Sequence, residues 1–173
     1  GFLKKVSRLV ASENLPVTWT TPKPLNFPVQ MMCYKKESKR VKTKMGDSII
    51  KLSIQSDTDE IDKRKTAQSI CPNFIHSLDA SVLHLAVVKA KQKGVTNFSL
   101  IHDSFGCVAP DVDMLSEAIR EAFCEIYEND VLANWAMEMR QMLSIKNMKK
   151  FPNIPQRGNL DLSLVKQSVF FCV

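Results

Sequence analysis

Residues 98–106 read F-S-L-I-H-D-S-F-G, which places a histidine and an aspartate at the end of an apolar run, with a glycine just beyond. Phe98–His102 has the composition of a buried strand and Phe105–Ala109 that of its partner, so we expect Asp103 and Ser104 at a tight turn. Ladder hydrogen bonds on both sides would confine the carboxylate to a small volume, as a metal site requires. Residues 97–109 therefore predict a hairpin that aims Asp103 into a cleft. Asp and Ser are also common turn residues, so a purely structural turn is the alternative.

Length and composition indicate one globular core or one large piece of something bigger. A chain of 173 residues can bury one core. Its five cysteines include no C-x-x-C pair, which argues against a disulfide framework and against a structural zinc site. Because no apolar run approaches the roughly 18 residues of a membrane span, we expect no membrane partner. The expected location is the cytoplasm, that of a host cell if the protein is viral, with a mitochondrion or plastid as alternatives.

Positive charge is concentrated in one segment. The net charge is +6, and residues 35–51 alone contain seven lysines and arginines against two carboxylates. Strands over Gln30–Tyr34 and Ser48–Ile54, with a turn near Gly46, make residues 30–57 a predicted protruding basic hairpin. Such a density of cations is typical of a surface that binds polyanions, although a solvated lysine-rich loop has the same composition.

Helical patterns surround the two hairpins. We expect helices over 2–14, over 58–93 with a start at Ser56 or Thr58 and a break at Pro72, and over 112–145. In the second helical region a buried stripe is predicted, and His76, Asp79 and Leu83 form a neighbouring one. The predicted fold class is therefore α+β. The residues expected in the buried stripe are Ile75, Leu78, Val82, Leu85 and Ala86.

A metal phosphohydrolase is a second interpretation of the His-Asp pair. Enzymes of the HD type place a histidine, an adjacent His-Asp and a further aspartate around a metal, and His76 or His84 with His102 and Asp103 match that set by count. The ligands of that family lie on helices, whereas residues 98–108 have strand composition, which disfavours it.

Several segments together resemble the C-terminal portion of the bacteriophage-type single-subunit DNA-dependent RNA polymerases. The strongest are P-N-F-I-H-S-L-D-A-S at 72–81 and S-L-I-H-D-S-F-G at 99–106. The resemblance implies the C-terminal part of a right-hand polymerase fold, in which a palm hairpin carries the catalytic aspartate and packs on helices. Further matching segments in family order are W-T-T-P (19–22), F-P-V-Q (27–30), D-E-I-D-K-R-K (59–65), R-E-A-F-C-E-I-Y-E (120–128) and G-N-L-D-L (158–162).

The resemblance implies roles for individual residues in catalysis. Asp103 corresponds to one of two catalytic aspartates that hold a pair of Mg²⁺ ions, the second aspartate being supplied from outside this chain. His102 would lie beside the primer terminus, and His76 would face the minor groove of the new base pair. Residues 158–173 correspond to a C-terminal foot that packs near the active centre, with Phe171 and the terminal carboxylate of Val173.

The resemblance also implies a nucleic-acid contact. Residues 30–57 occupy the position of the family's specificity loop, which enters the promoter major groove. A two-stranded ribbon fits that groove. The candidate nucleic-acid-binding residues are Lys39, Arg40, Lys42, Lys44 and Gln55.

Other catalytic residues of that family are missing. The first catalytic aspartate and the residues that bind the incoming nucleotide have no counterpart between Gly1 and Ser69. We therefore expect a C-terminal part or split subunit of a DNA-directed RNA polymerase, inactive until a second polypeptide or the rest of the same chain completes it. Its expected partners are a DNA template with its promoter, nascent RNA and nucleoside triphosphates. The alternative is a non-catalytic nucleic-acid-binding module with a polymerase-derived fold.

Overall fold

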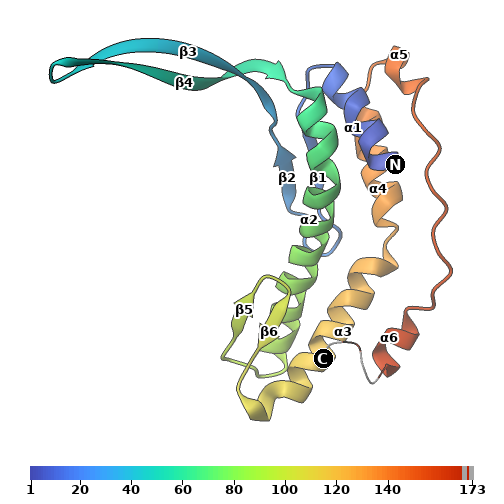
Figure 1. Ribbon diagram of the computed structural model, residues 1–173. Helices are drawn as coiled ribbons and strands as arrows, with labels where there is room; N and C mark the ends of the chain where they lie inside the picture. The colour runs from blue at the N-terminus through green and yellow to red at the C-terminus, as the bar shows by residue number, and fades with distance from the viewer. Residues whose placement is uncertain (169–170, 172–173) are drawn as a thin grey trace.

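A long helix, α2, runs through the centre of the molecule, and α1, α3 and β2 pack against it (Figure 1). The computed structural model describes residues 1–168 and 171. Helices and hairpins both contribute, which confirms the α+β class. The elements are α1 (Phe2–Ser12), β1 (Val17–Thr20), β2 (Pro28–Met31), β3 (Tyr34–Met45), β4 (Ser48–Ile61), α2 (Lys63–Gln92), β5 (Ser99–Ile101), β6 (Ser104–Gly106), a 3₁₀ turn (Ala109–Asp111), α3 (Val112–Glu128), α4 (Val131–Gln141), α5 (Ile145–Met148) and α6 (Ser163–Gln167).

Helix α2 starts later than expected. The Asp62 carboxylate accepts hydrogen bonds from the backbone N–H groups of Arg64 and Lys65, both at 2.9 Å, and so caps the helix. Thr58 caps nothing, because it lies in β4 and its hydroxyl donates to the Lys35 carbonyl at 3.1 Å. Residues 58–61 are therefore strand, where the sequence predicts helix.

The expected break at Pro72 is not found, since α2 continues through it to Gln92. A proline inside a helix removes one backbone hydrogen bond. Burial on both sides of it favours the unbroken helix: Ile70 and Phe74 lie in the core at 0% and 5% exposure.

Two hydrophobic clusters follow each other along α2. The first joins α1, β1, β2 and α4 around Phe74 and Trp135, and the second joins α3 to the later turns of α2 around Leu85 and Ile119. Most of the expected stripe on α2 is confirmed. Ile75 is the exception at 51% exposure, because it is one position off the buried line of Ile70, Phe74, Leu78, Leu85.

The basic hairpin is formed by β3 and β4 and projects from the helical body (Figure 1). It runs from Tyr34 to Ile61, whereas the sequence predicts 30–57. Gln30 belongs to β2 and pairs with Thr18 of β1, because this register also buries Val17 and Met31 against the first cluster. The Asp62 N–H donates to the Cys33 carbonyl at 2.7 Å and closes the root of the hairpin.

The helices expected over 112–145 correspond to α3 and α4. Asp130 lies between them, and its carboxylate accepts from the Ala133 N–H at 3.0 Å and caps α4. The chain then returns to α3, where Arg157 donates to the carbonyls of Tyr127 and Glu128 at the end of that helix. In the described part of the chain, no helix is long and apolar enough to cross a membrane.

Candidate active site and nucleic-acid interface

The hairpin β5–β6 carries the His-Asp pair at its tip. Ile101 pairs with Ser104, so the two-residue loop consists of His102 and Asp103, one position earlier than expected. His102 has a φ of 53°, a left-handed conformation that non-glycine residues seldom adopt. Gly106 avoids crowding where the strands meet, since a Cβ there would lie 3.3 Å from the Ser99 carbonyl oxygen. The loop is thus a tight turn with strain at the histidine.

The hairpin is anchored at its base and free at its tip. Phe98 and Phe105 pack against the second cluster, but Ile101 is 67% exposed and both loop residues are exposed. The expectation of a fully buried strand is therefore wrong. Each strand has only three residues, and the tip that they carry is exposed beside α2 and α3.

A pocket of about 670 Å³ lies between the hairpin tip and α2. It brings together three of the residues predicted from the sequence, His76, His102 and Asp103. Asp79 and His84 also line it, and the sequence analysis assigns them no role in a polymerase. Helical spacing could have indicated both residues from the sequence, since positions 76, 79, 80, 83 and 84 share one face of α2.

His84 is held in place by two neighbours. Its Nδ1 lies 2.6 Å from the Ala80 carbonyl, and since a carbonyl only accepts, Nδ1 carries the proton. Its ring meets Phe27 edge to face at 6.1 Å between centroids. In the neutral ring, Nε2 is then left as an acceptor.

Asp103 can act as one ligand of a magnesium ion, but the described residues do not form a complete metal site around it. Within residues 1–168 and 171, no three His, Cys, Asp or Glu side chains gather where a metal ion could bind. The HD-type interpretation requires such a set and finds no support. Magnesium usually takes one or two protein carboxylates and fills its shell with substrate phosphates and water. Asp103 can serve as one of these carboxylates.

The register of β3–β4 divides the candidate nucleic-acid-binding residues between two faces. Directly paired residues in an antiparallel ribbon point to the same side. Lys42 faces Lys51, Arg40 faces Ser53 and Ser38 faces Gln55, so these side chains share one surface, here called the basic face. Lys39 pairs with Ile54 on the opposite side. The basic face contains Lys36, Ser38, Arg40, Lys42, Lys44, Ile49, Lys51, Ser53, Gln55 and Asp57.

Like charges placed directly opposite each other destabilise a sheet. Lys42 and Lys51 are such a pair, and no carboxylate forms an ion pair with either of them among the described residues. A polyanion lying on the basic face would relieve this repulsion.

The foot residue Phe171 packs on α3. Its ring lies 5.0 Å from that of Phe123, and the guanidinium of Arg120 stacks over it at 5.7 Å. Arg120 also donates to the Val165 carbonyl at 3.0 Å and to the Ser168 carbonyl. Val173 and its carboxylate lie outside the described residues.

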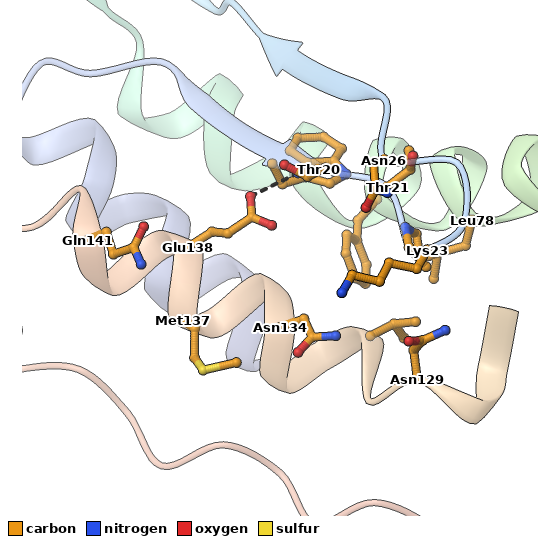
Figure 2. A pocket seen from close by; sticks show the side chains of 14 residues that line it. Thr20, Thr21, Lys23, Asn26, Leu78, Asn129, Asn134, Met137, Glu138 and Gln141 are labelled. Carbon is orange, nitrogen blue, oxygen red and sulfur yellow. Dashed lines mark hydrogen bonds between the residues drawn. The ribbon is translucent and has the colours of Figure 1, made fainter.

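A separate pocket of about 460 Å³ lies near β1 and α4 (Figure 2). Amide side chains of Asn26, Asn134 and Gln141 line it, and the Thr20 N–H donates to the Glu138 carboxylate at 2.8 Å across it. No histidine and no aspartate lines this pocket. The Thr20–Glu138 hydrogen bond joins β1 to α4.

Residues 3–150 match the family model described as DNA-dependent RNA polymerase. The chain belongs to the phage-type, single-subunit branch of that family. This confirms the resemblance seen in the sequence. The match extends over the candidate active site, the basic hairpin and all helices from α1 to α5.

Plant polymerases are among the relatives of this RNA polymerase family member. It is 40% identical over 165 residues to "DNA-directed RNA polymerase 2, chloroplastic/mitochondrial" of Arabidopsis thaliana, which covers 95% of this chain and 15% of that protein. It is 34% identical over 171 residues to "DNA-directed RNA polymerase 1, mitochondrial" of Nicotiana sylvestris, covering 99% of this chain and 16% of that protein. With "DNA-directed RNA polymerase 1A" of Nicotiana tabacum it shares 35% identity over 163 residues, covering 94% of this chain and 99% of that protein. The chain thus spans about one sixth of the length of the first two relatives.

Proposed function

We propose that this chain supplies a catalytic hairpin and a nucleic-acid-binding ribbon to a DNA-directed RNA polymerase. One observation carries the proposal: His76, His102 and Asp103 line a single pocket, in a chain whose residues 3–150 match the family model. The first catalytic aspartate and the groups that bind the incoming nucleotide come from outside this chain, from a second polypeptide or from the rest of the same one.

Asp103 holds magnesium in this proposal. Its position at a two-residue loop leaves the carboxylate little freedom, and its exposure leaves room for nucleoside triphosphates and for a second aspartate. When bound, a pair of magnesium ions supplies activation of the RNA 3′-hydroxyl and neutralises the pyrophosphate leaving group in an in-line transfer.

The two histidines orient the nucleic acid. His102 adjoins Asp103 and lies beside the primer terminus. His76 lines the same pocket from α2, and it donates a hydrogen bond to the minor groove of the new base pair. Acceptors there are shared by all base pairs, so one donor checks pairing geometry without selecting a sequence.

The basic face of β3–β4 binds the DNA template at its promoter. Its lysines lie on phosphates, and Arg40 and Gln55 are the side chains suited to base edges, since arginine pairs with guanine and glutamine with adenine. Nascent RNA and nucleoside triphosphates are the remaining partners. Because the relatives' names refer to chloroplasts and mitochondria, an organelle is favoured over the cytoplasm expected from composition.

The substitution Asp103→Asn tests the catalytic role. In the completed polymerase it should lower the rate of nucleotide addition by at least about 100-fold, which corresponds to about 2.7 kcal/mol of transition-state stabilisation. Promoter binding, measured in a gel-shift assay, should stay within about twofold. Asp113→Asn is the matched control, since Asp113 is an exposed carboxylate in the first turn of α3, away from the pocket.

Retention of full activity by Asp103→Asn would contradict the metal-ligand assignment. If neither the unsubstituted polymerase nor Asp103→Asn adds nucleotides while both bind DNA, the proposed enzyme is replaced by the alternative, a non-catalytic binding module.

A further inference from the structure

The face of the β3–β4 ribbon opposite the basic face is apolar. The register places Val41 opposite Leu52 and Thr43 opposite Ile50, with Met45 nearer the tip. We call this surface the apolar face; it comprises Val41, Met45, Ile50, Leu52 and Ile54, accompanied by Glu37, Lys39, Thr43, Ser48 and Ser56.

All five of these large apolar side chains are open to solvent in the chain by itself. Their exposed fractions run from 37% for Ile50 to 71% for Met45. Isolated exposed apolar residues are common on protein surfaces, but a continuous apolar stripe marks a contact surface. On a two-stranded ribbon such a stripe has no second layer to cover it.

The ribbon also needs support to work as proposed. Ten residues of β3, from Lys36 to Met45, extend about 33 Å at 3.3 Å per residue. An isolated two-stranded hairpin of this kind is marginally stable in water. Side chains that contact base edges must be held within about 0.5 Å, so a ribbon supported only at its root is too flexible.

We propose that the apolar face docks on an apolar protein surface contributed by the part of the polymerase that lies outside this chain. The inference rests on the proposed function. The basic face directs the nucleic acid to one side, which leaves protein as the occupant of the other. The occupant is sought outside this chain because the chain spans about one sixth of the long relatives and no described element covers the stripe.

Lys39 acquires a different role from its neighbours. It lies on the apolar face beside Ile54 and Val41, so its charge belongs at the rim of the protein contact and not on a phosphate. Arg40 and Lys42, which both lie on the basic face, retain the nucleic-acid role.

Photo-crosslinking in the completed polymerase, bound to promoter DNA, tests the docking. A photoreactive amino acid at Leu52 should crosslink to polypeptide outside these 173 residues. The same group at Ser53, the adjacent exposed position on the basic face, should crosslink to DNA. Crosslinks from Leu52 to DNA, to a second copy of this chain, or to nothing would each overturn the proposal.

Limited trypsin digestion without DNA gives an independent measurement, because the ribbon is rich in lysine. Ile50→Ser combined with Leu52→Ser should speed cleavage of the ribbon in the completed polymerase at least about tenfold, while cleavage in the isolated chain stays unchanged. Ile49→Ser is the matched control: Ile49 is 73% exposed and equally apolar but lies on the basic face, so its loss should leave the rate within about twofold.

Equal cleavage of both variants in the completed polymerase would refute the docking. That failure is distinct from failure of the proposed function, which is decided by nucleotide addition in Asp103→Asn and not by protection of the ribbon.

Discussion

The two exposed hairpins of this polymerase segment are built in opposite ways. The β5–β6 hairpin has three residues in each strand, and aromatic side chains at its base pack into the second cluster. The β3–β4 ribbon has strands of 12 and 14 residues and contacts the body only at its root. A short anchored hairpin holds one carboxylate in a fixed place, whereas a long ribbon reaches a distant surface and depends on a partner for stiffness.

The root of the ribbon shows how much of it this chain supports. The Asn14 side chain accepts from the Ile61 N–H at 2.8 Å and donates to the Asp59 carbonyl at 3.1 Å. Lys35 and Glu60 form an ion pair at 2.5 Å nearby. Beyond these contacts, each residue of β3 after Tyr34 is exposed. Anchoring therefore decreases sharply within a few residues of the body.

The largest expected effect on folding contrasts the two hairpins directly. Phe105→Ala should lower the free energy of unfolding by about 2–3 kcal/mol, because the ring packs partly buried against the second cluster. Leu52→Ala on the ribbon should change it by less than about 0.5 kcal/mol, since that side chain is exposed. Urea unfolding of the 173-residue chain measures both. Equal losses would show that the ribbon packs on the body.

The second prediction concerns DNA binding by the ribbon. Neutralising Lys42 and Lys44 together should reduce the slope of log affinity against log salt by up to about 1.8, at about 0.9 for each lost phosphate contact. Lys39→Gln, on the other face, should leave the slope nearly unchanged. Titrations of labelled promoter DNA at several salt concentrations measure the slopes. A fall of about 0.9 for Lys39→Gln would reject the division into faces.

A smaller effect is expected from the strain at the His102 turn. His102→Gly should raise the free energy of unfolding by about 0.5 kcal/mol, because relief of the left-handed conformation exceeds the entropy that glycine adds to the unfolded chain. Nucleotide addition should fall in the same variant if the histidine orients the primer.

Asn14→Gly is the control for this turn. Asn14 also has a positive φ, of 58°, but its side chain makes the two hydrogen bonds at the ribbon root. Its removal should therefore destabilise the chain by about 1–2 kcal/mol, at about 1 kcal/mol for each bond. Stabilisation by both substitutions would show that the hydrogen bonds at the root contribute nothing.

The smallest effect concerns pH at the ribbon root. The hydrogen bond from Lys35 holds the pKa of the Glu60 carboxyl below its usual 4.5. Since the folded pKa is lower than the unfolded one, the ion pair stabilises the fold above pH 4.5, and this is lost as pH falls through the folded value. An NMR titration should find the Glu60 midpoint below 4.5, and Lys35→Gln should raise that midpoint. An unchanged Glu60 midpoint in that variant would show that the ion pair with Lys35 does not lower the pKa of Glu60.

Prediction from sequence succeeded where local patterns and recognisable segments agree. The β5–β6 hairpin with Asp103 in its turn and the buried positions Leu78, Leu85 and Ala86 of α2 were all expected. The prediction that β5 is buried was wrong, because composition describes a strand's residues but not what covers them. The helix start at Thr58 was wrong as well, since Asp59 and Glu60 suit a helical first turn equally well until Lys35 is placed opposite them in the sheet.

The sequence by itself determined the polymerase family, the α+β class and the β5–β6 turn to within one residue, because these depend on short segments whose residues are neighbours in the chain. Only the tertiary structure decided that His76 and His84 of α2 meet Asp103 at one pocket, and that Lys39 lies beside Ile54 on the apolar face of the ribbon. Both depend on strand register and helix packing. A shift of one residue in register would move the side chains of one strand to the other face of the ribbon.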